Sequence, residues 1–314
     1  MELQFLGTGA GMPSKIRNTS ALVLNLSAEG RGYWLFDCGE ATQHQILHTS
    51  LKPRKISKVF ITHLHGDHIF GLPGLIGSRS FLGGNEPLDI YGPAGLEEWL
   101  ETTLRITNTH LNYELQIHEV GDGIVVEDDE FLVVANSLQH VIPCLGYRIE
   151  QKPLPGKLLI DKVKEAGVPS GPLLKQLKDG EDVTLEDGRV VHSQDVTGEP
   201  QNGFTVAILG DTSYCAAAVE LAQAVDILVH EATFDMETGN LAKEYGHSTI
   251  GDAARVAKEA GVTTLIANHI SARFMPSDVA KLKEQGEAIF STLHIAEDFV
   301  RFEWKDGAVI ECRS

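Results

Sequence analysis

The sequence lacks long apolar runs. In its 314 residues there is no stretch of about 18 consecutive apolar residues, the length that a membrane-spanning helix needs. The N-terminal segment MELQFLGTGAG also lacks the basic start and long apolar core of a secretory signal. We therefore expect a soluble, cytoplasmic protein that has no contact with membranes and enough chain to bury a large core.

Cysteine and positive charge are also scarce. The sequence contains four cysteines, which are far apart and form no CxxC pair: Cys38, Cys144, Cys215 and Cys312. This spacing argues against a disulfide framework or a thiolate zinc knuckle, so we expect reduced thiols. Lysine and arginine number 26 against 44 acidic residues, and the formal charge of −18 argues at first sight against a polyanionic partner.

What the sequence does contain is an alternation of short apolar segments with helical patterns. Strands are expected near residues 2–6, 21–26, 33–37, 58–62, 88–92, 131–137, 205–210, 226–232 and 264–269. Helices are expected around residues 40–49, 94–104, 248–260 and 277–290. This alternation is typical of a mixed α/β fold whose sheets are covered by helices.

One interval, residues 150–202, breaks this rhythm. It carries Pro and Gly clusters but few strong apolar patterns, so we interpret it as an excursion held between two core strands. Seven basic and three acidic residues lie between Tyr147 and Lys178, which gives a local balance of +4. An acidic body with a basic arm fits a protein that touches RNA at defined places and avoids indiscriminate binding.

The stretch THLHGDHIFG at residues 62–71 collects metal-ligand side chains directly after an apolar strand. Three histidines and an aspartate fall within six positions: His63, His65, Asp67 and His68. The first two can project from the loop towards one ion, and the last two can turn towards a second. Imidazole nitrogens with one or two carboxylates suit zinc, and an acidic side chain can bridge two ions.

Ligand types recur at later strand ends. Asp211 and His269 directly follow apolar strands, and His140 follows the stretch NSLQ. Strand ends are where α/β folds place their chemistry. The HxHxDH motif with a later His, Asp and His resembles the metallo-β-lactamase superfamily.

That resemblance implies a four-layer αββα sandwich, an α/β (α+β) fold with a binuclear zinc site at one edge. Carried over by position, one zinc would be held by His63, His65 and His140. The other would be held by Asp67, His68 and His269. Asp211 would bridge the two ions.

Four further stretches resemble the ribonuclease Z family within that superfamily. PSKIRN (13–18) resembles its PxKxRN loop, and HEAT (230–233) and HST (247–249) match two of its motifs. GVPSGP (167–172) resembles the glycine-proline motif of the flexible arm with which that family grips the tRNA elbow. In Ser271-Ala272-Arg273, where part of the family has Ala-x-Arg, the first position departs from the pattern but the arginine is kept.

The resemblance implies a zinc-dependent endoribonuclease that removes the 3′ trailer from precursor tRNA. Cleavage would leave a 3′-hydroxyl on the tRNA and a 5′-phosphate on the trailer. Residues 1–314 would form one metallo-β-lactamase-like domain, into which residues 150–202 are inserted as a tRNA-binding arm. The same resemblance implies a homodimer and two zinc ions per chain.

Several residues then acquire expected roles. Asp67 would orient the attacking water or accept its proton. The departing ribose oxygen needs a proton, and His247, oriented and kept cationic by Glu231, is the expected donor. The residues expected to position phosphates and the tRNA end are Lys15, Arg17, Asn18 and Arg273. Within the arm, the residues expected to contact tRNA are Gly167, Pro169, Gly171 and Pro172.

Each of these motifs could also serve only to stabilise the fold. The Lys15 and Arg17 loop could be an ordinary solvated turn. His247 or Ser248 could cap the amphipathic helix that follows. His230 reads as a hydrogen-bonded core histidine.

Two other functions remain open on the sequence. A general metallo-hydrolase acting on small esters, thioesters or sulfates would need the same ligands but no basic arm. A non-catalytic RNA-binding subunit would tolerate missing ligands. All seven ligand positions are filled, which disfavours the second of these functions.

Overall fold

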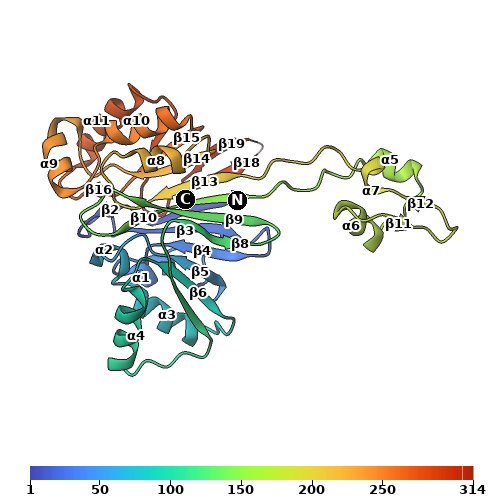
Figure 1. Ribbon diagram of the computed structural model, residues 1–314, viewed down its shortest axis with the longest axis horizontal. Helices are drawn as coiled ribbons and strands as arrows, with labels where there is room; N and C mark the ends of the chain where they lie inside the picture. Colours follow the sequence, from blue (N-terminus) through green and yellow to red (C-terminus); the bar gives the residue numbers. More distant parts are fainter. Residues whose placement is uncertain (306, 314) are drawn as a thin grey trace. The chain divides into compact units, whose positions relative to one another are not determined.

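The computed structural model describes residues 1–305 and 307–313, and its chain divides into two compact units. The larger unit comprises Met1–Val126, Val133–Ile149 and Thr205–Ser314, and the smaller comprises Glu127–Leu132 and Glu150–Phe204. Their elements can be followed by label in Figure 1. Within the described residues, no helix combines the length and the hydropathy that crossing a bilayer requires.

The first sheet has eight strands in the order β19-β18-β1-β3-β4-β5-β6-β7. Neighbouring strands are antiparallel from β19 to β4 and parallel from β4 to β7. The strands are β1 (Glu2–Gly7), β3 (Ala21–Leu26), β4 (Gly32–Phe36), β5 (Ile56–Phe60), β6 (Leu88–Gly92), β7 (Leu115–Glu119), β18 (Arg301–Lys305) and β19 (Ala308–Cys312).

The second sheet has seven strands in the order β17-β15-β14-β13-β10-β9-β8, of which β13, β14, β15 and β17 run parallel. The strands are β8 (Gly123–Glu127), β9 (Phe131–Leu138), β10 (Cys144–Gln151), β13 (Thr205–Leu209), β14 (Ile227–Glu231), β15 (Thr264–Asn268) and β17 (Leu293–Ile295). The short strands β2 (Gly9–Ala10) and β16 (Ile270–Ser271) pair with each other.

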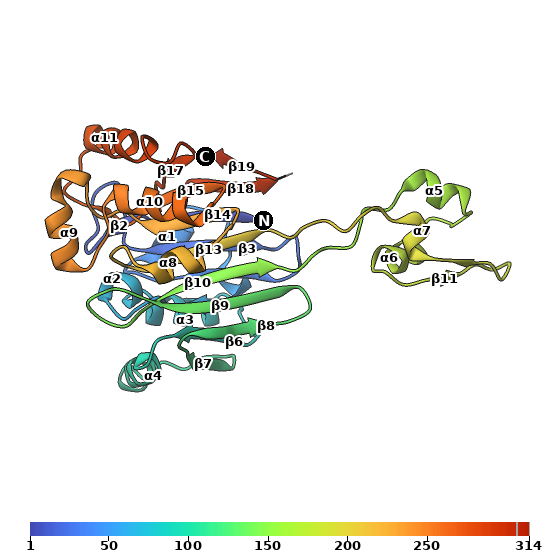
Figure 2. The same cartoon turned by 45° about the horizontal axis from the view of Figure 1, so that its top comes forward.

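Helices cover the outer faces of the two sheets, as Figure 2 shows. The first sheet carries α1 (Thr42–Leu47), α3 (Leu72–Phe81) and α4 (Leu96–Ile106), and the short α2 (Gly66–Ile69) lies before α3. The second sheet carries α8 (Ala216–Leu221), α10 (Ile250–Ala260) and α11 (Pro276–Glu287), and α9 (Gly239–Tyr245) precedes α10. The expected αββα sandwich is confirmed.

Aromatic side chains from both sheets meet between them. The ring of Tyr147, from β10, is fully buried and lies 5.3 Å from the Phe60 ring and 6.2 Å from the Phe36 ring, centroid to centroid. Its hydroxyl donates a hydrogen bond to the Ile61 carbonyl at 2.7 Å. This contact ties the second sheet to the carboxyl end of β5, directly before the histidine-rich stretch.

The smaller unit has an apolar core of its own, which the composition of residues 150–202 did not indicate. It contains α5 (Ile160–Glu165), α6 (Pro172–Lys178), α7 (Ser193–Val196), β11 (Val183–Thr184) and β12 (Val190–Val191). Its core side chains are Val163, Val168, Leu177, Val183, Leu185, Val191 and Val196. These residues are spaced singly along short elements, so they produce no strong periodicity in the sequence.

The charge of the longer segment of this unit, residues 150–204, is uneven. From Glu150 to Phe204 there are ten acidic and seven basic residues, so the positive balance is confined to the first half of the segment. The lysines of α5 and α6 are exposed: Lys162, Lys164, Lys175 and Lys178. A polyanion would therefore be attracted to the helical half of the unit and repelled by the other half.

Gly7, at the end of β1, marks a close approach between two backbone segments. A Cβ atom at this position would lie 1.7 Å from the Thr19 carbonyl oxygen. Because backbone cannot move aside as a flexible side chain can, we expect Gly7→Ala to lower the free energy of unfolding by about 1–3 kcal/mol. Thermal unfolding measures the change. Gly121→Ala, where a Cβ meets nothing within 4 Å, is the control, and equal losses in both variants would contradict this account.

Candidate metal centre

Loops that follow strands of both sheets bring the metal-ligand side chains together. His63, His65, Asp67 and His68 follow β5 of the first sheet, whereas His140, Asp211 and His269 follow β9, β13 and β15 of the second. The seven residues predicted from the sequence thus lie at one edge of the sandwich, in two groups that could each hold a metal ion. Asp211, His247 and His269 form a third such group, which overlaps these two.

The first group consists of His63, His65, His140 and Asp211, whose ligand atoms lie within 4.8 Å of one another. The His65 Nδ1 atom is 3.1 Å from Nε2 of His63 and 3.3 Å from Nε2 of His140. The Asp211 carboxylate lies 3.6 Å from Nε2 of His63.

The second group consists of Asp67, His68 and His269. Nε2 of His269 is 3.3 Å from both Nε2 of His68 and Oδ2 of Asp67. Oδ2 of Asp211 also lies 3.5 Å from Nε2 of each of these histidines. The Asp211 carboxylate therefore stands between the two groups, where it could bridge two ions.

The opposite ring nitrogens of four of these histidines are hydrogen-bonded, which fixes their tautomers. Each Nδ1–H donates to an oxygen: His63 to Thr62 Oγ1 at 3.0 Å, His68 to Asp37 Oδ2 at 2.7 Å, His140 to the Gly246 carbonyl at 2.8 Å and His269 to Thr233 Oγ1 at 2.9 Å. The Nε2 lone pairs are left facing one another at separations that would be repulsive without a cation between them. This arrangement is that of metal-ligating histidines, and it fits a metal at both groups.

The protonation state of His63 supports the same assignment. Burial lowers the pKa of His63 well below its usual value, and the neighbouring His68 lowers it further. His63 is therefore held as a neutral imidazole, the form that binds metals.

Asp37 and Thr233 were not predicted as site residues, although they orient His68 and His269. Asp37 ends the apolar segment 33–37 and Thr233 ends the HEAT motif, so the strand-end pattern that found the ligands could have found them too. Asp37 and His269 both adopt left-handed backbone, with φ of 56° and 55°. Strain of this kind in non-glycine residues is common at functional sites.

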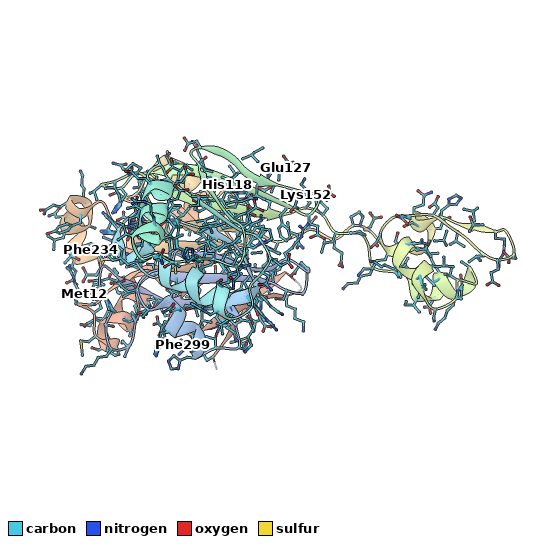
Figure 3. The ribbon with its side chains drawn as sticks, turned by 90° about the horizontal axis from the view of Figure 1, so that it is seen from below. Met12, His118, Glu127, Lys152, Phe234 and Phe299 are labelled. Carbon is cyan, nitrogen blue, oxygen red and sulfur yellow. The ribbon has the colours of Figure 1, made fainter. Side chains whose placement is uncertain are left out.

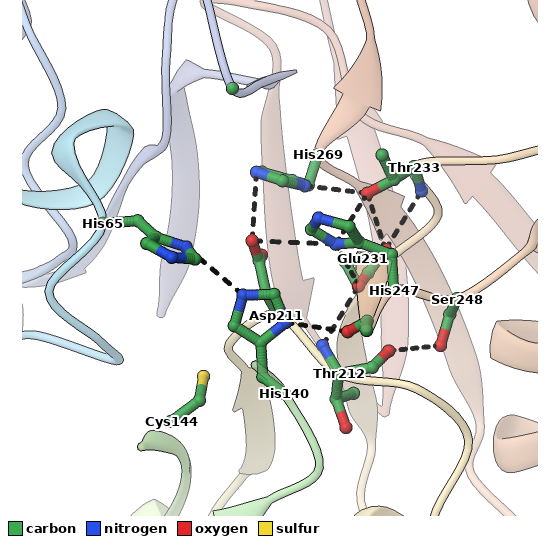
Figure 4. Close-up of polar contacts among 12 residues, drawn as sticks. His65, His140, Cys144, Asp211, Thr212, Glu231, Thr233, His247, Ser248 and His269 are labelled. Carbon is green, nitrogen blue, oxygen red and sulfur yellow. Dashed lines mark hydrogen bonds and ion pairs between the residues drawn. The ribbon is translucent and has the colours of Figure 1, made fainter. Parts of the chain in front are cut away.

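Beside the metal groups lies a pair formed by Glu231 and His247, shown in Figure 4. Nδ1 of His247 donates to Oε1 of Glu231 at 2.8 Å. The Glu231 carboxylate is 2% exposed and also accepts from the Thr212 N–H at 3.0 Å and from the Thr233 hydroxyl at 2.6 Å. Burial alone would lower the pKa of His247, but the hydrogen bond and charge of Glu231 raise it to about 9. The His247 imidazole is therefore favoured in its cationic form, with its Nδ1–H committed to Glu231.

Hydrogen bonds in this region show whether His247 or Ser248 caps α10 and whether His230 is a core histidine. The N-cap of α10 is Thr249, whose side chain accepts from the Asp252 N–H in a capping box, so neither His247 nor Ser248 caps the helix. The Ser248 hydroxyl instead donates to the Thr212 carbonyl at 2.6 Å. His230 is a fully buried core histidine whose Nδ1–H donates to the Glu231 carbonyl at 2.7 Å.

The two basic residues of the loop that carries the PSKIRN motif differ in their exposure to solvent. Lys15 is exposed, whereas Arg17 is only 6% exposed and donates to Thr8 Oγ1 and to the Ala296 carbonyl, both at 2.6 Å. Burial lowers the pKa of Arg17. The Arg17 guanidinium therefore stabilises the loop through buried hydrogen bonds and does not face solvent.

Asn18 and Gly11 hold the same loop against the site. The Asn18 N–H donates to Asp298 Oδ2 at 2.7 Å, and its side-chain amide donates to the Glu40 carbonyl at 2.7 Å. The Gly11 N–H donates to Oδ2 of Asp67 at 2.7 Å. The loop therefore reaches directly to a residue of the second metal group.

Arg273 lies at the rim of the site. Its side chain is exposed, with Nε donating to Ser271 Oγ at 3.1 Å and the guanidinium 4.7 Å from the centre of the Phe234 ring. Phe234 is labelled in Figure 3. A hollow of about 410 Å³, here called the ligand hollow, is lined by Arg273, Asp67, His140 and His247 among others.

The glycine-proline motif lies in the smaller unit, between α5 and α6. Gly167 and Gly171 adopt positive φ of 75° and 146°, which side chains rarely tolerate, and Pro172 begins α6. These three residues and Pro169 are exposed. The motif therefore forms an outward-facing turn and is not part of the metal groups.

Comparison with known proteins places these features in a family. The chain is 53% identical over 302 residues to ribonuclease Z of Anoxybacillus flavithermus, covering 96% of this chain and 97% of the relative. It is 53% identical over 305 residues to ribonuclease Z of Bacillus licheniformis, covering 97% and 99% of the two chains. The family model described as "Anti-Pycsar protein Apyc1" matches residues 1–142.

Solved structures agree. The short form of human tRNase Z is 31% identical to this chain, with a TM-score of 0.70, and covers 96% of this chain and 99% of its own. The metallo-β-lactamase fold protein YhfI from Bacillus subtilis, 21% identical with a TM-score of 0.67, covers 96% and 99% and shares the fold. With ribonuclease Z relatives more than half identical along nearly its whole length, and with the histidine and aspartate groups at the sandwich edge, this chain belongs to the ribonuclease Z family of metallo-β-lactamase fold proteins.

Proposed function

We propose that this protein is an endoribonuclease that removes the 3′ trailer from precursor tRNA, leaving a 3′-hydroxyl on the tRNA and a 5′-phosphate on the trailer. The observation that carries the proposal is that, in a ribonuclease Z family member, two metal-ligand groups with Asp211 between them lie beside a hydrogen-bonded pair, Glu231 and His247. Metal ions held by the two groups would activate water for attack on a phosphodiester. The Glu231–His247 pair would protonate the oxygen that leaves.

The metal groups would hold two zinc ions. His63, His65 and His140 form one ligand set, and Asp67, His68 and His269 form the other, with Asp211 between them. Nitrogen-rich sets with one or two carboxylates and hydrogen-bonded outer nitrogens are those that zinc prefers. When bound, such ions supply Lewis acidity that activates water and offsets negative charge on the phosphoryl oxygens.

The protein's own residues supply the rest of the chemistry. Asp67, held by the Gly11 N–H at 2.7 Å, would orient the attacking water or accept its proton. The leaving atom is a ribose oxygen, which is a poor leaving group unless it is protonated. His247 would supply that proton from Nε2, because its Nδ1–H is committed to Glu231 at 2.8 Å.

Substrate contacts follow from exposure. We assign the exposed Lys15 and Arg273 to contact with RNA phosphates at the rim. Arg17, whose guanidinium is buried, and Asn18, whose amide is only partly exposed and donates to the Glu40 carbonyl, would position the loop. Gly167, Pro169, Gly171 and Pro172, which form the outward-facing turn of the smaller unit, would contact tRNA. That recognition would rest on backbone shape more than on sequence. A homodimer is part of this proposal through family membership alone.

The direct test is incubation of the protein with a precursor tRNA followed by mapping of both product ends. A cut after the last nucleotide of the mature tRNA, with a 5′-phosphate on the trailer, is expected. A small phosphodiester hydrolysed as well as precursor tRNA would instead favour a general metallo-hydrolase.

Chelation should abolish activity reversibly. Removal of the ions with a strong chelator is expected to reduce cleavage to background, because the site loses its Lewis acid, and adding zinc should restore it. Elemental analysis of the active protein is expected to give two zinc ions per chain. A fully active protein that contains no more than one metal per chain would overturn the binuclear assignment.

A further inference from the structure

His247 stands where two hollows meet. One is the ligand hollow, which contains the metal-ligand side chains. The other, here called the outer hollow, measures about 710 Å³ and is lined by Gln139, Tyr214, Met236, Lys243, Arg255 and Ile289 among others. His247 lines both hollows. The reacting phosphate would occupy the ligand hollow, so the outer hollow has no assigned ligand.

The outer hollow has one basic side chain, Lys243, that is available to a phosphate. Lys243 and Arg255 lie on its wall, and the carboxylate on that wall, Asp252, is engaged by the N–H and hydroxyl of Thr249 at 3.0 Å and 2.7 Å. Among the described residues, no carboxylate lies within ion-pair distance of Lys243. Arg255 is paired with Glu259, so Lys243 is the side chain of this wall that can attract a phosphate.

The same wall offers a flat surface. The Arg255 guanidinium lies 4.1 Å from the centre of the Tyr214 ring, and Glu259 fixes both side chains by accepting from Arg255 Nε at 2.8 Å and from the Tyr214 hydroxyl at 2.6 Å. The Arg255 side chain is still 56% exposed. Nucleobases stack on guanidinium planes and on aromatic rings held in this way, and the partly exposed Met236 provides further apolar surface.

The direction of the RNA strand follows from the chemistry of the cut, so this step rests on the proposed function. Water attacks phosphorus, the bond from phosphorus to O3′ breaks, O3′ takes a proton from His247, and the phosphate stays on the trailer. The ribose that carries O3′ must therefore touch His247. Because His247 lines both hollows, a phosphate in the ligand hollow leaves the outer hollow for the base on that ribose.

We propose that the outer hollow binds the last nucleotide of the mature tRNA, whose base stacks on the Arg255 and Tyr214 surface while Lys243 attracts the adjoining phosphate. The trailer then leaves through the ligand hollow, which Asp67 and Arg273 also line. The subsite accepts any of the four bases, because a stacking surface recognises their common flat face.

The test combines protein variants with abasic precursor tRNAs under single-turnover conditions. One substrate lacks the base on the 5′ side of the cut, and the other lacks the base on the 3′ side. For the wild-type protein, loss of the 5′-side base is expected to slow cleavage about tenfold. Arg255→Ala should slow cleavage of the intact precursor to a similar extent and show no further loss with the 5′-side abasic substrate, because both changes remove the same contact.

Two matched variants sharpen the result. Lys258→Ala removes a neighbouring exposed charge of α10 that does not line the outer hollow, so it should respond to the abasic substrates as the wild type does. Arg255→Lys keeps the charge but loses the plane, so it should behave like Arg255→Ala. Coupling of Arg255 to the 3′-side base, or equal sensitivity of all variants to the 5′-side base, would overturn the proposal. A wild-type protein that cannot cleave the intact precursor would overturn the proposed function and this inference together.

Discussion

Replacing His247 by alanine is expected to slow cleavage of precursor tRNA by about 10²–10⁴-fold. A positioned general acid contributes this much only when the leaving group is basic enough to need a proton. A ribose alkoxide does need one, whereas a nitrophenolate departs readily as an anion. The same variant should therefore lose far less activity on bis-nitrophenyl phosphate.

A substitution of Glu231, the hydrogen-bond partner of His247, is expected to have a smaller effect than loss of His247 itself. Glu231→Gln keeps a hydrogen-bond acceptor but removes the negative charge, and it is expected to act in the same direction more mildly. The Glu231 carboxylate also holds the Thr212 N–H and the Thr233 hydroxyl, the latter being the oxygen that orients His269. Part of the loss in this variant will therefore come through the metal site.

Metal content separates these effects. Zinc should be measured in both variants, because His247 also lies 3.8 Å from the Asp211 carboxylate. If His247→Ala keeps its zinc and slows both substrates equally, the residue positions the site or tunes the metal, and the proton comes from elsewhere.

Replacing residues 155–195 by a short linker is expected to weaken precursor-tRNA binding severely while leaving hydrolysis of a small phosphodiester nearly intact. The removed segment contains most of the smaller unit's own apolar core and the exposed lysines of α5 and α6. The two chains that lead into the unit are paired, with the Leu154 N–H donating to the Gln201 carbonyl at 2.8 Å. A linker can therefore join them without disturbing the sandwich.

A charge variant tests the cause of that loss. Replacing the α5 and α6 lysines Lys162, Lys164, Lys175 and Lys178 by alanine keeps the fold of the unit, because all four side chains are exposed. Precursor binding should weaken and depend less steeply on salt, since fewer phosphates are neutralised. Equal losses on both substrates in the linker variant would show that the segment is needed to build the sandwich, contrary to this account.

Local sequence patterns were sufficient for about half of the observed strands and for four of the helices. Each of the nine expected strands overlaps an observed one, and the four expected helices correspond to α1, α4, α10 and α11. The sequence pattern missed strands such as β7 and β8, whose side chains are partly exposed and interspersed with charges. Burial on one face produces a readable pattern, whereas an exposed edge does not. The strand β10 was also missed although most of its residues are buried, and exposure does not explain that case.

The sequence by itself determined which side chains gather at the site. His63 to His68 are fixed by spacing within one loop, and Asp211 and His269 by their position directly after buried strands. These signals are local, because a strand end and a short loop dictate where their own side chains emerge.

Only the tertiary structure decided which ring nitrogens face the metal groups, because the orienting oxygens come from distant segments: Asp37 contacts His68 across 31 positions, and Gly246 contacts His140 across 106. It also decided that Arg17 is buried, through a contact with Ala296, 279 positions away. The outer hollow likewise combines residues from the loop after β9, the turn before α8, and the helices α9 and α10. Such contacts depend on how whole elements pack, and packing between distant segments leaves no periodic or local mark in a single sequence.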